Sequence, residues 1–308
     1  MSAPSLTDKP AVVSAPRRVA RLTGRDRVVV ALMVVVPTLL VIGLVWLPAI
    51  ATVALSFTSW NGIGGLDSIK WIGTTNYVNV FTNYPPFKPA IEHNLLWLAF
   101  LFLLATPFGV FLAVLLDKEI RGSRFYQTAV YLPVVLSLAL IGFIWQLFYS
   151  QDQGLINAVL GTNIDWYGDP RINIWAVLVA ASWRHVGYVM LLYLAGLKAV
   201  DPSLREAAAI DGASDSVTFF RIVLPVMRPI NIIVVVITVI EALRAFDLVW
   251  VVNKGFNGLE LISALVTQNV IGEASRIGFG SALATIMLVV SLVFIGVFLG
   301  TVVREERP

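Results

Sequence analysis

Long apolar runs are the feature that most limits how this chain can fold. The first run extends from Val28 to about Phe57, and five more follow it along the 308 residues. An apolar stretch of 18 or more residues is long enough to cross the hydrocarbon core of a bilayer as a helix. We therefore expect an all-α integral membrane protein with six transmembrane helices. The expected spans lie at about residues 28–57, 95–116, 128–149, 172–196, 230–251 and 279–302.

The composition agrees with a membrane protein. Charged residues make up 13% of the chain, against roughly 25% in ordinary soluble domains. Arginines precede the first run and Ala49-Ile50-Ala51 offers a cleavage site, as in a secretory signal peptide. However, the apolar part of a signal peptide is only about 7–15 residues long, and this run is about twice that length. We expect an uncleaved first span.

The positions of lysine and arginine predict the orientation. If the N-terminus lies inside, fifteen of the 22 Lys and Arg residues are cytoplasmic, five are on the outer side and two are within spans. Basic residues are retained on the cytoplasmic side, so both termini are expected there, in the plasma membrane. We expect a disordered tail at residues 1–24, one six-span domain at 25–303 and a short tail at 304–308. The net charge of +3 then reflects orientation, and no nucleic-acid partner is expected.

The polar segment, residues 197–229, separates the fourth and fifth spans and is dense in charge, glycine and proline. Asp201 is a plausible N-cap, with Pro202 at the first helical position. Gly212 can take the left-handed conformation that ends a helix, and Ser214 or Asp215 can cap a second helix. We expect two short helices with a hinge between them, facing the cytoplasm.

The second of these helices carries apolar residues at helical spacing. Val217, Phe220 and Leu224 are three and four residues apart, so we expect them to form one apolar stripe, ending before Pro225. By its residues alone, the polar segment also fits an amphipathic re-entrant or interfacial loop.

The polar segment resembles the EAA motif of permease subunits of binding-protein-dependent ABC importers. Glu206-Ala207-Ala208 is followed after three residues by Gly212. After nine further residues comes Ile-x-Leu-Pro, which begins at Ile222. The longer form, with Asp-Gly-Ala and Pro229, is similar to the carbohydrate-uptake branch (maltose- and glycerol-phosphate-like). The resemblance implies that the polar segment docks as a coupling helix into a groove of a separate ATPase subunit. The residues assigned to this contact are Glu206, Ala207, Ala208, Asp211, Gly212, Val217, Phe220, Arg221, Leu224 and Pro225.

The resemblance also implies partners and a substrate class. It implies a second, similar permease subunit, two ATPase subunits (or an ATPase homodimer), an extracytoplasmic solute-binding protein and surrounding membrane lipid. The solute is expected to be a sugar, an oligosaccharide or a related polyol. Alternatives that remain open are an ABC permease for a phosphorylated polyol or a peptide, and, in another class, a channel or secondary transporter.

Motifs for catalysis are missing from the sequence. There is no phosphate-binding G-x-x-x-x-G-K-[ST] loop, so ATP and Mg²⁺ are expected in the partner ATPase and no cofactor in this chain. Two distant histidines and the lack of cysteine make a metal site unlikely on chemical grounds. We expect a non-catalytic subunit.

Ionisable residues within the predicted spans are the candidates for lining a solute path. A charge at the bilayer centre costs about 2.5–3.5 kcal/mol on insertion scales, so such residues face water or a partner. Glu241 and Arg244 are three residues apart and can pair on one helix face, and Arg184 could also reach Glu241. His185 is expected to be packed and not to act as a ligand. The expected path-lining residues are Trp183, Arg184, Tyr188, Glu241 and Arg244. A polar lock between helices, or contact with a partner subunit, explains the same residues equally well.

A weaker likeness to sugar permeases occurs at Phe246-Asp247. The family usually continues there with Thr-x-Gly-Gly-Pro, whereas this chain has Asn-Lys-Gly-Phe-Asn-Gly at residues 253–258. This departure leaves the identity of any particular sugar open.

Overall fold

The computed structural model describes residues 23–118, 121–272 and 275–305. Within these ranges the regular structure is helical, and the only β-type pairing is an isolated bridge between Thr58 and Trp71. The all-α prediction is therefore confirmed. The predicted tail at residues 1–24 lies almost entirely outside the described residues. The chain divides into two compact units, residues up to Ile50 and residues from Ala51 onward.

The described part of the first unit is an apolar helix. Helix α1 (Gly24–Val41) begins with a capping box in which Thr23 accepts from the Asp26 amide and Asp26 accepts from the Thr23 amide. The helix continues through the π-helical turn η1 (Ile42–Trp46) into α2 (Leu47–Leu55), where the second unit begins. The whole helical stretch of 32 residues is long and apolar enough to cross a membrane.

Three more helices in the described residues are long and apolar enough to cross a membrane. One is formed by α4 (Phe87–Phe100), the π-helical turn η3 (Leu101–Ala105) and α5 (Thr106–Asp117). The others are α9 (Asn173–Ala199) and α16 (Ile277–Glu305), in which the stretch from Ile277 to Phe298 is long and apolar enough. These three helices contain the second, fourth and sixth expected spans.

The third expected span is broken. Helix α6 (Ser123–Tyr131) passes into the 3-10 turn η4 (Leu132–Val135), and α7 (Leu138–Phe148) leaves at an angle of 107°. The bend has a local cause, because Pro133 lies in the 3-10 turn and Ser137, in extended conformation, caps α7 by accepting from the Leu140 amide at 3.2 Å. The expected span at residues 128–149 is therefore formed by parts of two helices that meet at an angle.

The fifth expected span is also interrupted. Helix α13 (Arg228–Leu243) ends before residues 244–246, and α14 (Asp247–Asn253) follows. Side chains from other helices satisfy carbonyl groups at this break, since Asn94 donates to Ala242 O at 3.3 Å and the Ser263 hydroxyl donates to Ala245 O. Unpaired backbone groups are costly inside a membrane, so such partners make a break tolerable there. A second bend, of 78°, separates residues 215–226 from 228–253, and the candidate spans reach six if each bent pair counts as one.

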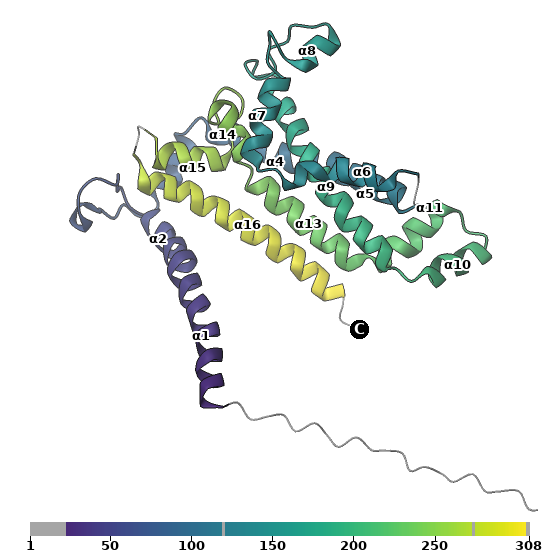
Figure 1. The fold of residues 1–308 in the computed structure, drawn as a ribbon. Helices are drawn as coiled ribbons and strands as arrows, with labels where there is room; N and C mark the ends of the chain where they lie inside the picture. Colours follow the sequence, from purple (N-terminus) through teal and green to yellow (C-terminus); the bar gives the residue numbers. More distant parts are fainter. Residues whose placement is uncertain (1–22, 119–120, 273–274, 306–308) are drawn as a thin grey trace, which may run out of the picture. The chain divides into compact units, whose positions relative to one another are not determined.

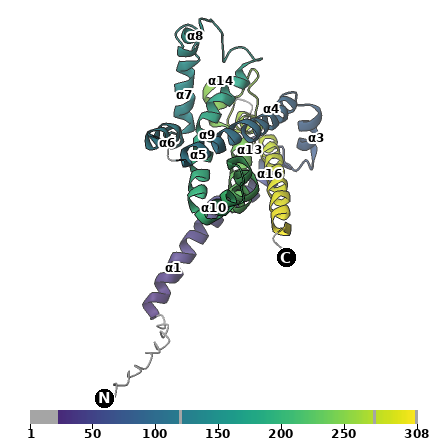
Figure 2. The same cartoon turned by 90° about the vertical axis from the view of Figure 1, so that its right-hand side faces the viewer.

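Shorter elements complete the second unit: η2 (Leu66–Ser68), α3 (Thr75–Thr82), α8 (Leu155–Leu160), α10 (Pro202–Ile210), α11 (Asp215–Thr218), η5 (Phe219–Val223), α12 (Leu224–Val226) and α15 (Ile262–Val270). Helix α10 lies at the end of α9 that is farther from α14 in both views (Figures 1 and 2). The polar segment and the loop after α14 are thus at opposite ends of the helices.

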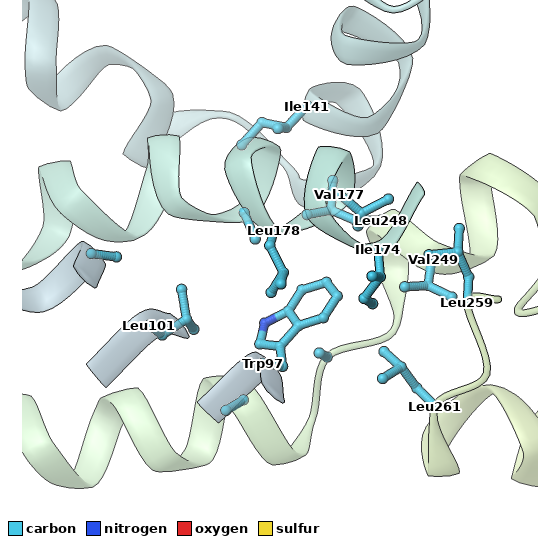
Figure 3. Packing of buried hydrophobic residues seen from close by; sticks show 14 of the residues in the cluster. Trp97, Leu101, Ile141, Ile174, Val177, Leu178, Leu248, Val249, Leu259 and Leu261 are labelled. Atoms are coloured by element: carbon cyan, nitrogen blue, oxygen red, sulfur yellow. The ribbon is translucent and has the colours of Figure 1, made fainter. Parts of the chain in front are cut away.

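Three apolar clusters hold the helices of the second unit together, the third of which packs α3 and α4 against α15 and α16. The first surrounds Trp97 and contains buried side chains from α4, α7, α9 and α14, with Leu259 and Leu261 from the loop before α15 (Figure 3). The second lies nearer α10 and includes Leu116, Tyr193, Val223 and other buried side chains of α5, α9 and α13. The second cluster packs Val223 and Met227 of the polar segment against α5 and α9.

Candidate functional site

The polar segment folds as two helices around Gly212, and the expected caps are confirmed. Asp201 caps α10 by accepting from the Ser203 amide at 2.9 Å, with Pro202 in the first turn. Gly212 has φ +77°, a conformation that side-chain-bearing residues rarely adopt. Ser214 is the cap of α11, accepting from the Val217 amide at 3.4 Å.

The predicted apolar stripe does not form as expected. The π-helical turn η5 follows α11 directly, and its wider turn shifts the side-chain register. Val217 and Phe220 are exposed, the latter by 65%, whereas Leu224 packs with the buried cluster near α10. Leu224 is therefore half-buried against this cluster, and the expectation of one stripe with Val217 and Phe220 was wrong. Ile210, the last residue of α10, is 87% exposed and was missed in the sequence.

The remaining residues assigned to the ATPase contact are mostly on the surface. Ala208 is buried, at 3% exposure, and accepts a backbone hydrogen bond from Ala213. The exposed residues of the set are Glu206, Ala207, Asp211, Gly212, Val217, Phe220, Arg221 and Pro225. An isolated isoleucine on an otherwise alanine-rich polar helix was the signal that could have identified Ile210.

Ion pairs tie the polar segment to the end of α5. Asp117, the last residue of α5, has a side chain only 9% exposed. Its Oδ2 accepts from Arg205 Nη1 at 2.7 Å, and its Oδ1 lies 3.4 Å from Lys198 Nζ. A carboxylate at a helix C-terminus is unfavourable for the helix dipole, and the two cations offset this. No sequence motif marks Asp117, which directly follows the span expected at residues 95–116.

A second contact reaches the other half of the polar segment. Lys118 Nζ donates to Asp215 Oδ2 at 2.8 Å. This hydrogen bond, together with the lysine charge, lowers the pKa of Asp215 below its ordinary value. Below the polar segment, Asn231 donates to Leu224 O at 2.8 Å and accepts from the Tyr193 hydroxyl at 2.7 Å. Both short helices are thus fixed to α5, α9 and α13.

The charged residues of the predicted spans pair between helices. Glu241 Oε1 accepts from Arg184 Nη1 at 2.9 Å, and His185 Nδ1 lies 2.9 Å from Glu241 Oε2. His185 is buried, and its Nε2 lies 3.1 Å from the hydroxyl of Thr106 and 3.3 Å from that of Thr238. The Arg184–Glu241 contact was anticipated, and His185 is packed as expected.

The expected pair between Glu241 and Arg244 is wrong. Helix α13 ends at Leu243, so Arg244 is no longer on the helix face that carries Glu241, and its side chain is exposed. Arg184 and Glu241 keep 25% and 29% of their side chains exposed, and Arg184 Nε is buried with no hydrogen-bond partner among the described residues. The pair therefore lies at the margin of the packed helices, with unused hydrogen-bonding capacity.

The aromatic residues predicted near this pair are partly enclosed. Trp183 is half-buried and meets Trp145 edge to face, with ring centroids 5.9 Å apart. Tyr188 is half-buried. No group of three or more metal-ligating side chains is found in the described part of the chain.

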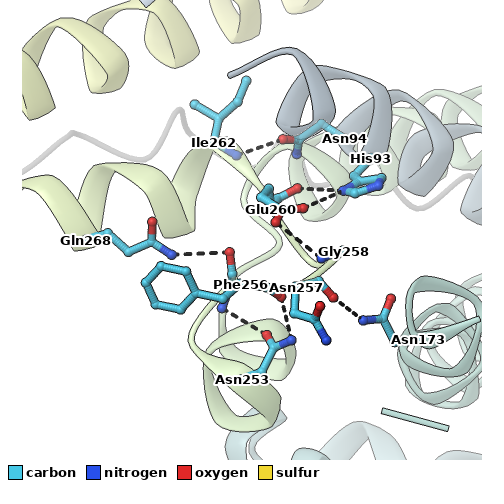
Figure 4. Close-up of polar contacts among 11 residues, drawn as sticks. His93, Asn94, Asn173, Asn253, Phe256, Asn257, Gly258, Glu260, Ile262 and Gln268 are labelled. Carbon is cyan, nitrogen blue, oxygen red and sulfur yellow. Dashed lines mark hydrogen bonds and ion pairs between the residues drawn. The ribbon is translucent and has the colours of Figure 1, made fainter. Parts of the chain in front are cut away.

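The loop between α14 and α15 is held by amide side chains (Figure 4). Asn253 donates to Phe256 O at 2.5 Å, and Asn173 of α9 donates to Asn257 O at 2.5 Å. On the other side of the loop, His93 Nδ1 lies 3.0 Å from Glu260 O. The sequence Asn-Lys-Gly-Phe-Asn-Gly therefore builds an ordered loop in place of the Gly-Gly-Pro form.

Comparison with known proteins identifies the family. A family model described as "binding-protein-dependent transport system inner membrane component" matches residues 105–305, well over half of the chain. A probable ABC transporter permease protein of Pyrococcus horikoshii is 30% identical over 276 residues, covering 86% of this chain and 92% of that protein. The xylose/arabinose import permease protein of Haloferax volcanii is 32% identical over 253 residues, covering 80% of this chain and 79% of that protein.

The fold is also similar to a solved structure. A chain of the bacterial alginate ABC transporter, crystallised with an alginate pentasaccharide-bound periplasmic protein, has a TM-score of 0.77 and 21% identity, covering 92% of this chain and 96% of that chain. This likeness shows that the chain has the fold of that transporter chain. The family match and the two sequence relatives establish that this chain belongs to the permease subunits, or inner membrane components, of binding-protein-dependent ABC transport systems.

Proposed function

We propose that this chain is a membrane subunit of an ATP-driven importer that carries a sugar, an oligosaccharide or a related polyol across the cytoplasmic membrane. The substrate class is supported by the likeness of the polar segment to the carbohydrate branch and by the relative named for xylose and arabinose import. In this proposal the polar segment and both termini face the cytoplasm, and the loop after α14 faces outward.

The observation that carries the proposal is the exposed apolar surface of the polar segment. Ile210 and Phe220 are large, largely exposed apolar side chains on either side of Gly212. Burying one such side chain contributes about 1.5–3 kcal/mol, so they suit insertion into a groove of a partner. The partner is the ATPase subunit, which supplies ATP and Mg²⁺ binding. Glu206 and Arg221 flank these anchors and supply polar contacts at the rim.

The mechanism follows from the ion pairs and packing contacts that join the polar segment to the long helices. When the two ATPase subunits close on ATP, they draw the polar segments of this chain and of the second permease subunit together. The ion pairs of Asp117 pass this movement to α5, and the packing of Leu224 passes it to α9 and α13. A packed interface has discrete arrangements, not a continuous range, so the permease pair alternates between outward-open and inward-open forms. Gly212 is the hinge within the polar segment.

The solute reaches the permease from an extracytoplasmic binding protein, as the family description implies. Arg184 and Glu241 are the candidates for lining its path, because they are polar, partly exposed and within the predicted spans. Arg244 lies exposed in the helix break nearby. The subunit itself is non-catalytic.

Co-purification tests this proposal. The full transporter is isolated from native membranes through this chain, as wild type, as Phe220→Asp and as Phe256→Asp. Phe256 is a matched control, since it is 56% exposed but lies in the loop at the opposite end of the helices. We expect an ATPase and a second permease to co-purify with the wild type and with Phe256→Asp, and the ATPase to be lost from Phe220→Asp.

Recovery of a homo-oligomer without any ATPase would contradict the proposal and favour a channel or carrier. The substrate class is tested on the binding protein that belongs to the purified transporter. Its thermal stability is measured with monosaccharides, oligosaccharides, phosphorylated polyols and peptides. Stabilisation by a peptide or a phosphorylated polyol and by no sugar would refute the carbohydrate assignment.

A further inference from the structure

A polar hollow of about 470 Å³ lies between the chain after α2, helix α3 and the beginning of α16. Helix α3 comes just before α4, and the 31-residue helix that begins with α4 ends at Asp117 beside the polar segment. At 1.5 Å per residue, that helix separates the hollow from the polar segment by about 46 Å. In the proposed orientation the hollow is therefore on the outer side. The Arg184–Glu241 pair is not among its lining residues.

The lining of the hollow has the chemistry of a carbohydrate site. Side-chain amides and aromatic rings make up most of its lining, and none of the described residues that line it carries a carboxylate. Amides donate to and accept from sugar hydroxyls, and aromatic faces cover the apolar face of a sugar ring. The residues that matter most here are Trp60, Asn61, Asn79, Asn83, Tyr84 and Arg276.

One donor in the lining has no partner. The indole Nε1 of Trp60 is buried and makes no hydrogen bond to the described residues. Unsatisfied buried donors are rare in proteins and call for an explanation such as an absent ligand or water. Asn83 Nδ2 donates to Asn79 Oδ1 at 3.1 Å. This bond leaves the Oδ1 of Asn83 and the Nδ2 of Asn79 available. Three neighbouring groups can thus bind one polyhydroxylated ligand.

The walls of the hollow are fixed before any ligand binds. The Gly278 amide donates to Trp60 O at 2.9 Å, and Gly278 approaches Thr58 so closely that a Cβ would lie 2.0 Å from Thr58 O. Asn76, on α3, donates to the carbonyl of Thr58 at 2.8 Å. Tyr84 meets Phe279 of α16 edge to face, with centroids 5.1 Å apart. A preformed site loses little freedom on binding.

We propose that this hollow is a carbohydrate subsite at the outer face of the permease, separate from the path within the membrane. Its volume is within the range of small-ligand sites, about 300–1,000 Å³, and suits one or two sugar rings. Arg276 is the one charged residue among the described residues of the lining, and its positive charge favours neutral or acidic sugars over cationic solutes. The inference rests on the proposed carbohydrate transport and adds a place where the solute is held on arrival from the binding protein.

Saturation-transfer NMR on the purified full transporter, without its binding protein, tests the subsite. The probes are D-xylose, L-arabinose, maltose and D-galacturonate. The variants are Asn79→Ala, Asn83→Ala and Trp60→Phe, the last of which keeps the ring but removes the unpaired donor. The control is Asn163→Ala, an exposed asparagine in another loop that does not line the hollow.

We expect at least one probe to receive saturation from the wild type and from Asn163→Ala. Affinity should fall about tenfold in Asn79→Ala and Asn83→Ala and about fivefold in Trp60→Phe, as expected for one lost hydrogen bond. Saturation of no probe, or equal affinity in all variants, overturns the subsite. Uptake by the complete transporter separates the two proposals. If the transporter imports a sugar, and the variants bind and import it as well as the wild type does, only the subsite fails. If the transporter imports only a non-sugar solute, the carbohydrate function fails.

Discussion

Removing the charge of Asp117 is the most informative single change at the contact between α5 and the polar segment. Asp117→Asn keeps the shape of the side chain but abolishes its ion pairs with Arg205 at 2.7 Å and Lys198 at 3.4 Å. Hydrogen bonds to charged groups contribute about 1.5–3 kcal/mol. Both cations are more than a third exposed, so solvent screening reduces this. We expect the docking of α10 onto α5 to weaken by about 1–2 kcal/mol, which is a factor of roughly 5–30 in the population of the undocked form.

Hydrogen exchange in the intact transporter measures this population. Amides of α10 should exchange about 5–30 times faster in Asp117→Asn, while those of α15, at the opposite end, should be unchanged. Asp117→Glu retains the charge and should stay near the wild type. Equal exchange of α10 in Asp117→Asn and wild type would refute the role given to this ion pair, and a similar rise in α15 would indicate general destabilisation instead.

Three further changes have defined outcomes. Gly212→Ala forces a residue with a Cβ into φ +77°, at a cost of about 1–2 kcal/mol; the transporter should assemble but hydrolyse more ATP per solute imported, and an unchanged ratio would dismiss the hinge. Glu241→Gln leaves the two partners of this residue, Arg184 and His185, poorly paired. Because the pair is partly exposed, the protein should be destabilised by only about 1–3 kcal/mol; an unchanged melting temperature would contradict this. The tie between Lys118 and Asp215 should persist at pH 5 and be lost only as the pH falls through the lowered pKa of Asp215. Exchange of α11 amides across an acid titration checks this, and loss of the tie already near pH 6 would contradict it.

Local signals in the sequence predicted the elements of the polar segment well. Asp201, Pro202, Gly212 and Ser214 act within a few residues of their positions, so their capping and turn preferences suffice to place α10 and α11. The apolar runs likewise predicted where long helices occur. Such features depend on the chain near the residue and not on distant neighbours.

Features that depend on distant partners were missed. The break at residues 244–246 is stabilised by Asn94 and Ser263, which come from other helices and carry no local signal in α13. The same break removed Arg244 from the face of Glu241, so a spacing of three residues suggested a pair that does not form. The ion pairs of Asp117 join residues about 80–90 positions apart.

The π-helical turn η5 explains the remaining error in the polar segment. Spacings of three and four residues predict a stripe only in a regular α-helix. The wider turn packs Leu224 against the apolar cluster and leaves Phe220 exposed. No residue type in this stretch specifies a π turn, which arises here where the helix packs on the cluster beneath it.

Site-directed cross-linking tests most directly that the polar segment docks on an ATPase. The chain contains no cysteine, so Phe220→Cys and Phe256→Cys each give it one thiol, which is labelled with a maleimide photo-cross-linker on the purified chain before the transporter is assembled. The account predicts that Phe220→Cys captures the ATPase subunit, that Phe256→Cys does not, and that ATP changes the yield of the first product. Capture of the ATPase from Phe256→Cys, or its absence from Phe220→Cys while the complex is intact, would contradict the coupling role of the polar segment.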